Sequence, residues 1–319
     1  MSKKSLILRL SSILLGVLII VGLIIYSGTS DVLDLFHKVS WSLIAYSTIL
    51  FFIPWFIRPL FIKLHTNFRF IECFKVINVT YMMNAILPAK AGDFHLIYYL
   101  KKRGLSLARS VNILIHYRIM DLLSLVVISL PLLYVYLNQH IPTRIIQYLA
   151  VVGLIIAIPM LIILDKKGII KRLFEILEKK LSVKFFKRFV GKSREIYSDY
   201  EDLLRSKKFF SFLISLSVWL VEGLVSYVIS LSIGYPIPIY VIFMAVSVGN
   251  ISKVIPITPG GLGIYETTII LLMGLFGIPN SVATLLAILD HVLKTLLGVL
   301  IGALSIIFIP LKNDLKSVG

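Results

Sequence analysis

Cysteine is almost absent from this chain, and recognisable cofactor motifs are missing. Cys73 is the single cysteine among 319 residues, which excludes internal disulfides and cysteine-rich zinc or iron–sulfur sites. The six histidines are scattered, and no two have metal-ligand spacing on one predicted helix. The sequence contains no Walker loop, no dinucleotide fingerprint and no His-Glu-x-x-His motif. We therefore predict no metal, no cofactor and no ATP hydrolysis by a recognisable route.

Charged residues are also scarce. They make up 15% of the chain, whereas soluble domains average about a quarter. Hydrophobic residues reach 58%, the mean hydropathy is +0.94, and apolar runs of bilayer-spanning length recur. This composition predicts an all-α polytopic membrane protein with a single transmembrane domain and six full spans. The spans are expected at residues 10–27, 41–62, 111–137, 145–164, 209–233 and 281–309.

The positive charge is distributed unevenly around these spans. With the N-terminus in the cytoplasm, the outer loops hold only Lys38 and Arg144, and nearly all other lysines and arginines outside the apolar segments lie inside. This asymmetry predicts a multi-pass protein of the plasma or inner membrane with both termini cytoplasmic. The net charge of +17 then needs no nucleic-acid partner. The basic loop 165–208 is either an amphipathic element on anionic headgroups or an ordinary solvated loop.

Two further apolar regions, about 71–100 and 237–277, are interrupted in the middle. Each has a proline four residues before a glycine, a combination that ends a helix. Backbone groups freed at that depth must be buried in protein or line a watery cavity, so we predict a re-entrant hairpin at each place. The two interruptions read Pro88-Ala-Lys90-Ala-Gly92-Asp93 and Pro256-Ile-Thr-Pro259-Gly260-Gly261-Leu-Gly263-Ile-Tyr-Glu266.

The same order of elements occurs twice along the chain. A span, an interrupted hairpin and a second span cover 41–137 and again 209–309, and a tryptophan three residues before Arg58 matches one three residues before Glu222. The predicted topology runs the two copies in opposite directions. This is an inverted-topology repeat, which in many transporters encloses a substrate site near the bilayer midplane.

Charged side chains occur within these apolar segments. Each costs about 2.5–3.5 kcal/mol at a helix centre, so such groups normally pair and face an interior cavity. Arg118 and Asp121 are three residues apart, and Asp290 and Lys294 are four apart, both helical pair spacings. Such pairs either line a substrate cavity or only hold the helices together.

The two lysines at the interruptions suggest a phosphate site. Free backbone N–H groups collect where a helix breaks, and Lys90 or Lys253 would add a positive charge there; snorkelling to the interface is the alternative. Asp93 and Glu266 would bind a cationic headgroup, carry a proton, or pair with Arg58 and Lys253. No catalytic residue is predicted. The candidate substrate-binding residues are Lys90, Gly92, Asp93, Arg118, Asp121, Lys253, Pro259, Gly260, Gly261, Gly263, Glu266 and Asp290, with Arg58, Glu222, His291 and Lys294 secondary.

Three features resemble the lysylphosphatidylglycerol synthase transmembrane (flippase-like) family. They are the two interruptions, the span that begins with Arg118 and Asp121, and above all the Pro-Gly-Gly-Leu-Gly-x-x-Glu run that ends at Glu266. The first motif of that family usually has Arg and Glu where this chain has Lys90 and Asp93. In longer members this region is implicated in moving aminoacylated phosphatidylglycerol between leaflets, and a separate soluble domain synthesises that lipid. Because the chain stops at Gly319, we expect that synthase domain to be absent.

The resemblance therefore implies a lipid translocase for an anionic lipid or lipid phosphate, and an enzyme is not the first expectation. Two other functions stay open: a membrane-embedded transferase acting on a lipid phosphate, or an accessory subunit of a lipid synthase. A homo-oligomer is a further expectation.

Overall fold

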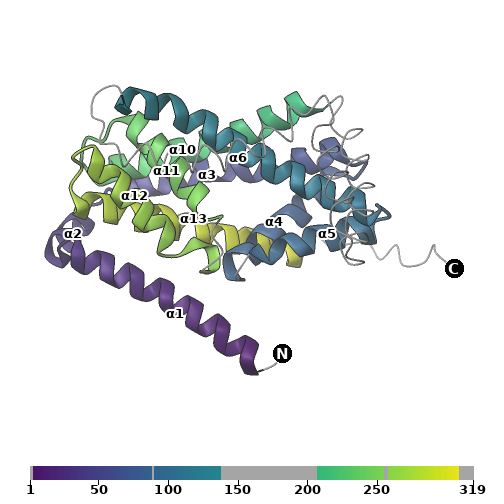
Figure 1. Ribbon diagram of the computed structural model, residues 1–319, viewed down its shortest axis with the longest axis horizontal. Helices are drawn as coiled ribbons and strands as arrows, with labels where there is room; N and C mark the ends of the chain where they lie inside the picture. The colour runs from purple at the N-terminus through teal and green to yellow at the C-terminus, as the bar shows by residue number, and fades with distance from the viewer. Residues whose placement is uncertain (1–2, 88–89, 138–206, 255–257, 309–319) are drawn as a thin grey trace, which may run out of the picture.

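The computed structural model describes residues 3–87, 90–137, 207–254 and 258–308, and within these ranges it contains helices and no strand. The predicted span 145–164 and nearly all of the basic loop 165–208 lie outside the described residues. Figure 1 shows the helices α1 (Lys3–Tyr26), α2 (Thr29–His37), α3 (Trp41–His65), α4 (Phe70–Ile86), α5 (Gly92–Lys102), α6 (Leu107–Leu137), α10 (Lys208–Ser232), α11 (Ile239–Ser252), α12 (Ile264–Leu275) and α13 (Asn280–Phe308), with the short 3-10 turn η2 (Pro259–Gly261) before α12.

Four of the described helices are long and apolar enough to cross a bilayer. They are α3, α6, α10 and α13, and they coincide with four of the predicted spans. The predicted first span corresponds to α1, where the chain bends by 91° after Tyr26 into the short helix α2. The α1–α2 pair would count as a fifth span. The sequence analysis did not predict α2, because its nine residues are fewer than the roughly 11–18 over which helical periodicity is read, and too few to span a bilayer.

The distribution of side chains differs from that in a water-soluble protein, because apolar side chains cover the outside as well as filling the core. Large apolar side chains are exposed on the outside, including Ile49 (68%), Leu271 (66%) and Phe308 (73%). Polar and charged groups are buried inside, including Asn78 and Asp290. Exposed apolar surface of this extent requires a lipid environment, and the chain is accordingly a multi-pass membrane protein.

Both interruptions predicted from the sequence are present, and each lies at the tip of a helical hairpin. α4 ends at Ile86 and packs on α5, and the start of α4 is joined to the end of α5 by an ion pair between Glu72 and Arg103. α11 ends at Ser252 and packs on α12, and the rings of Tyr240 and Phe276 meet at the open end, with centroids 6.3 Å apart. The two breaks are therefore the points where each hairpin turns.

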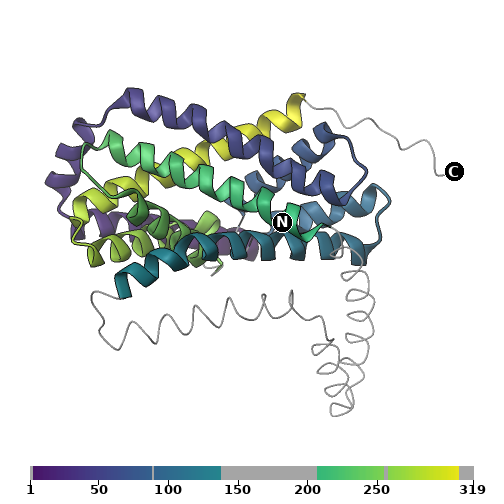
Figure 2. The ribbon, with the colours of Figure 1, turned by 90° about the horizontal axis from the view of Figure 1, so that it is seen from above.

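The two halves of the chain are interleaved. α3 packs along α10, while α4 of the first half packs along α13 of the second, and α11 of the second packs along α6 of the first (Figures 1 and 2). Two glycines let α13 lie close to α3 and α4. A Cβ on Gly298 would lie 3.1 Å from the Trp55 ring of α3, and a Cβ on Gly302 would lie 2.9 Å from the carbonyl oxygen of Asn78 on α4. Small residues at four-residue spacing are a common device for packing membrane helices.

Helix α1 touches the bundle mainly through its second half. Its N-terminal end stands away from the other helices in Figure 1. Gly16 lies against Leu262, and Ile19 lies against Gly263, so that α1 covers the outer side of the second break.

Candidate functional site

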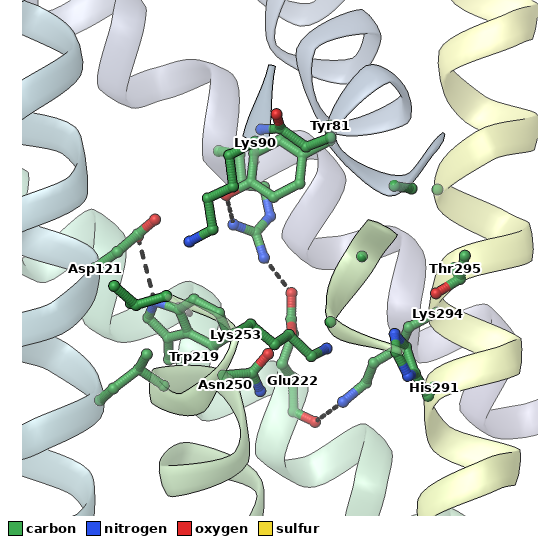
Figure 3. A pocket seen from close by; sticks show the side chains of 18 of the residues that line it. Tyr81, Lys90, Asp121, Trp219, Glu222, Asn250, Lys253, His291, Lys294 and Thr295 are labelled. Carbon is green, nitrogen blue, oxygen red and sulfur yellow. Dashed lines mark hydrogen bonds and ion pairs between the residues drawn. The ribbon is translucent and has the colours of Figure 1, made fainter. Parts of the chain in front are cut away.

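A cavity of about 400 Å³ lies between the two hairpin tips and is bounded by α3, α4, α5, α6, α10, α11 and α13. Figure 3 shows side chains from both breaks and from the long helices converging on it. Most of the charged residues predicted from the sequence line this one space. They are Arg58, Lys90, Asp93, Arg118, Asp121, Glu222, Lys253, His291 and Lys294, together with Gly260 and Gly261.

At the first break, Asp93 lies in the first turn of α5 and forms a bidentate ion pair with Arg118 on α6. The Arg118 Nε donates to Asp93 Oδ2 at 3.0 Å, and Arg118 Nη2 bonds Oδ1. Asn84 Nδ2 also donates to Asp93 Oδ1, at 2.8 Å. A Cβ on Gly92 would lie 2.6 Å from Asn84 Oδ1, so only glycine lets the start of α5 lie this close to α4.

Asp121, one turn beyond Arg118, binds the second half of the chain. It accepts hydrogen bonds from Ser215 Oγ at 2.5 Å and from Trp219 Nε1 at 3.2 Å, both on α10. The distance between Arg118 Nη1 and Asp121 Oδ2 is 3.7 Å. The predicted pair is present, and its carboxylate also tethers α6 to α10.

In the middle of the cavity wall, α3 and α10 are joined by an ion pair between Arg58 and Glu222. Both groups are nearly inaccessible to solvent. Arg58 Nη1 donates to the Tyr81 hydroxyl at 2.5 Å, and that hydroxyl lies 2.8 Å from the Tyr117 hydroxyl. The hydrogen bonds to charged and phenolic oxygens compensate part of the cost of desolvating this guanidinium.

The second break is shaped by glycine and closed by Glu266. Gly260, Gly261 and Gly263 have φ of 63°, 81° and 83°, a left-handed conformation that side chains with a Cβ rarely adopt. The Glu266 Oε2 accepts a hydrogen bond from the Gly263 N–H at 2.7 Å and thereby caps α12. The other oxygen, Oε1, lies 2.6 Å from His291 Nδ1.

Asp290 forms a buried network beside that loop. Lys294 Nζ lies 2.8 Å from Asp290 Oδ1, as the four-residue spacing predicted. Ser226 Oγ donates to the same oxygen at 2.6 Å, and the Tyr265 hydroxyl donates to Oδ2 at 2.5 Å. The network joins α10, α12 and α13.

The two lysines of the breaks differ from the other cations. Lys90 and Lys253 have no carboxylate within ion-pair distance among the residues that the structure describes. Lys253 Nζ lies 3.8 Å from the centroid of the Tyr265 ring, a cation–π contact. In Figure 3, Lys90 enters from the side of Tyr81 and Lys253 from the side of Asn250.

Sequence reasoning placed some residues at the site that only support it, and it missed others. Gly92, Pro259, Gly263, Glu266 and Asp290 do not line the cavity; they shape the breaks or hold residues that do. Asp93 and Glu266 pair with Arg118 and His291, not with Arg58 and Lys253. The residues missed are Trp55, Tyr81, Asn84, Trp219 and Asn250.

The missed residues are uncharged, so they do not stand out in an apolar helix. The repeated tryptophan three residues before Arg58 and Glu222 was the one signal available for two of them.

Within the described ranges, no three His, Cys, Asp or Glu side chains gather closely enough to hold a metal ion.

Comparison with known proteins gives one match over nearly the whole chain. The family described as the lysylphosphatidylglycerol synthase TM region matches residues 13–302. The UPF0104 membrane protein MJ1078 of Methanocaldococcus jannaschii is 28% identical over 239 residues, which are 73% of this chain and 96% of that protein. A second UPF0104 membrane protein of that organism, MJ1595, is 26% identical over 132 residues, 38% of this chain and 39% of the relative.

A shorter match has a different name. The glycosyltransferase AglD of Haloferax volcanii is 37% identical over 95 residues, which are 28% of this chain and only 15% of AglD. No solved structure is significantly similar to the chain.

Proposed function

The chain belongs to the lysylphosphatidylglycerol synthase transmembrane family, and from that premise and the charged cavity we propose that it is a lipid translocase. The headgroup of an anionic lipid or lipid phosphate passes through the cavity between the two hairpin tips, while its acyl or prenyl tails stay in the bilayer. The single observation that carries this proposal is the pair of lysines, Lys90 and Lys253, that reach one cavity from two helix breaks without a carboxylate partner among the described residues.

An unpaired ammonium group inside an apolar bundle is costly unless an anion or water compensates it. A phosphate that enters the cavity supplies that anion, and the two lysines hold it from two sides. Arg58 and Arg118 keep their own carboxylates and shape the wall around it.

The arrangement of the helices supports a transport cycle with alternating access. In this proposal the two hairpins are re-entrant, dip in from opposite faces, and are related by an inverted repeat over residues 41–137 and 209–309. The crosswise packing of α4 on α13 and of α11 on α6 is what such a repeat produces. The protein then lies in the plasma or inner membrane with both termini and the loop 165–208 on the cytoplasmic side.

The test is lipid movement in proteoliposomes that contain the purified protein and a fluorescent anionic phospholipid. An impermeant quencher reports the fraction of label that reaches the outer leaflet. Replacing both lysines (Lys90→Gln with Lys253→Gln) removes charge-assisted bonds worth about 1.5–3 kcal/mol each. The loss of one such bond in the rate-limiting step slows transport about 10- to 100-fold, so the double variant is expected to be slowed at least that much. Lys101→Gln, an exposed lysine at the end of α5, is the matched control and retains the wild-type rate.

Wild-type rates in the double variant, or no movement of any anionic lipid above that in protein-free vesicles, would refute the proposal. Activity that appears only after co-purification with a lipid synthase would assign the chain to the accessory role.

The similarity to AglD favours a second candidate, a membrane-embedded transferase that acts on a lipid phosphate. Asp93, near Lys90 at the first break, would be its base, but Asp93 is already held by Arg118 and Asn84. Incubating membranes with labelled sugar donors separates the two functions. Product that forms with the wild type and disappears with Asp93→Asn would favour the transferase.

A further inference from the structure

His291 is the one histidine that lines the cavity in the part of the chain that the structure describes. Its Nδ1 lies 2.6 Å from Glu266 Oε1, and the other oxygen of that carboxylate accepts the Gly263 N–H. An ionised carboxylate accepts hydrogen bonds at both oxygens and donates none, so Nδ1 carries the hydrogen of the neutral ring. The carboxylate thereby fixes the tautomer. Nε2 is left with a lone pair that can accept a proton.

This nitrogen lies where the two hairpin tips meet. A Cβ built on Gly260 of the second break would lie 3.9 Å from His291 Nε2 and 3.4 Å from the Ala85 carbonyl oxygen of α4. Figure 3 shows the ring on the α13 side of the cavity, beside Lys294 and Thr295. Within the described structure no hydrogen bond reaches Nε2. The cavity is partly open, so water can bring a proton to the ring.

The other titratable groups of the site keep a fixed charge. Asp290 accepts hydrogen bonds from Ser226 and Tyr265 and lies beside Lys294, and such partners stabilise an ionised carboxylate. The remaining carboxylates of the wall are each paired with an arginine, as described above. Lysine and arginine keep their protons near neutral pH, whereas the ordinary pKa of histidine is about 6.5. Among the described groups of the cavity, His291 is therefore the one whose charge can change near pH 7.

Charged groups of both signs face the ring. Glu266 on α12 and the adjacent Asp290 on α13 are negative, and Lys253 at the end of α11 is positive. Lys294, one turn further along α13, is held by Asp290. The two carboxylates stabilise a proton on the ring, and Lys253 offsets part of that stabilisation. The surroundings therefore accommodate both the neutral and the protonated ring.

The remaining neighbours of the ring bring no unpaired charge within the described structure. Tyr265 packs against the ring edge-on, with centroids 5.0 Å apart. On α10, Glu222 is paired with Arg58. On the other side of Gly260, α4 presents the uncharged backbone of Ala85.

The charges of the described site balance when His291 is neutral. The five lysines and arginines named above for the cavity are matched by five carboxylates: Asp93, Asp121, Glu222, Glu266 and Asp290. A phosphate monoanion that enters the cavity adds one negative charge, and a proton on Nε2 cancels it. An uncompensated charge is costly at membrane depth, so anion and proton stabilise each other in the cavity. A protonated Nε2 also donates to a phosphate oxygen, which the lone pair of a neutral ring would repel.

We propose that His291 binds the coupling proton of the transport cycle, so that one proton crosses the membrane with each anionic headgroup. The inference rests on the proposed translocase function and adds its driving force. Nε2 takes a proton from water on one side and returns it to water on the other. A lipid monoanion and a proton together carry no net charge, so the movement responds to a pH gradient and not to the membrane potential.

The experiment follows a fluorescent phosphatidylglycerol in proteoliposomes of the full chain, under a gradient of about one pH unit. Potassium and valinomycin clamp the membrane potential. The label is expected to accumulate in the leaflet on the alkaline side, up to about tenfold for one proton per lipid, because one pH unit is a tenfold ratio of proton activity. Nigericin, which collapses the gradient, is expected to abolish the accumulation. Protein-free vesicles under the same gradient correct for uncatalysed movement.

Three variants assign the effect to the ring. His291→Gln keeps a polar side chain but takes up no proton near neutral pH, so it is expected to lose the accumulation. Glu266→Gln is expected to move the pH of half-maximal lipid movement, measured without a gradient, down by about 1–3 units, because the imidazolium loses its carboxylate. A merely structural role of Glu266 would lower activity at every pH and leave that midpoint in place. His37→Gln replaces an exposed histidine at the end of α2 and is the matched control, with the wild-type gradient response.

Proton uptake tests the coupling without any variant. Short-chain phosphatidylglycerol is added to the detergent-solubilised protein in weak buffer, and the pH is recorded. Binding of the anion is expected to take up as much as one proton per lipid. Short-chain phosphatidylcholine, which has no net charge, is the control and is expected to take up none. The absence of uptake with phosphatidylglycerol at every pH between about 6 and 8, or equal uptake with both lipids, contradicts the inference.

The transport assay separates this inference from the function on which it rests. Equal label in both leaflets under the gradient, or accumulation on the acid side, overturns proton coupling, and movement above the protein-free rate still supports the translocase. An undiminished gradient response in His291→Gln overturns the assignment to His291. The absence of any movement above the protein-free rate overturns the translocase function itself.

Discussion

Lys90 has a left-handed backbone, with φ of 51°, and no other non-glycine residue in the described part of the chain has a positive φ. The second break has glycine at its left-handed positions, so a lysine here is an exception that calls for a reason. An L-residue in this conformation costs about 1–2 kcal/mol. Glycine would remove that cost, and would lose about 0.4–1 kcal/mol through the greater freedom of the unfolded chain.

Lys90→Gly is therefore expected to leave the stability unchanged or to raise it by about 1 kcal/mol, the difference between those two terms. The same substitution removes one of the two free cations of the cavity, so lipid movement should fall about 10- to 100-fold. Activity is thus expected to fall without any loss of stability, which general damage to the fold does not produce.

The measurements are thermal unfolding of the detergent-solubilised protein and the proteoliposome assay. Lys90→Ala is the control for strain: it lacks the charge but keeps a Cβ, so it should be as inactive as the glycine variant and less stable by about 1 kcal/mol. Lys90→Arg keeps the charge and should retain activity. The reasoning fails if Lys90→Gly transports at the wild-type rate, or if it is less stable than both the wild type and the alanine variant.

Two further predictions concern the bundle itself. Replacing one member of the buried Arg58–Glu222 pair, as in Glu222→Leu, should lower the free energy of unfolding by about 3–5 kcal/mol, because the partner charge is left uncompensated. The double variant with Arg58→Leu should recover part of that loss in thermal unfolding, and a purely additive result would contradict the account. Gly302→Ala should cost about 1–3 kcal/mol, since its Cβ would lie 2.9 Å from the Asn78 carbonyl oxygen. Gly22→Ala in α1, which has open space around it, should be neutral or stabilising in the same measurement.

Much of the architecture was predictable because hydropathy and helix breakers act locally. The spans that became α3, α6, α10 and α13 follow from apolar runs of bilayer length, and both interruptions follow from proline and glycine. The pair of Asp290 with Lys294 follows from helical spacing alone.

The partners of the other charges were not predictable in this way. Arg58 and Glu222 are 164 positions apart, and they meet only because α3 packs along α10. Asp93 is held by Arg118 because the turn at the first break directs α5 towards α6. Which cation is left without a carboxylate is a property of the whole arrangement, so the distinction between Lys90 and the arginines required the structure.

The crossed packing of α4 on α13 and of α11 on α6 has a consequence for how the chain reaches its native state. Within each half one long helix packs on the interrupted helix, α3 on α4 and α10 on α11, but the second long helix that packs on it, α13 or α6, comes from the other half. The first half made without the second would leave Asn78 and the neighbouring residues of α4 without their contact with α13. The two halves are therefore packed into each other and are not separate modules. The packing of the first hairpin is complete only after α13 has been synthesised.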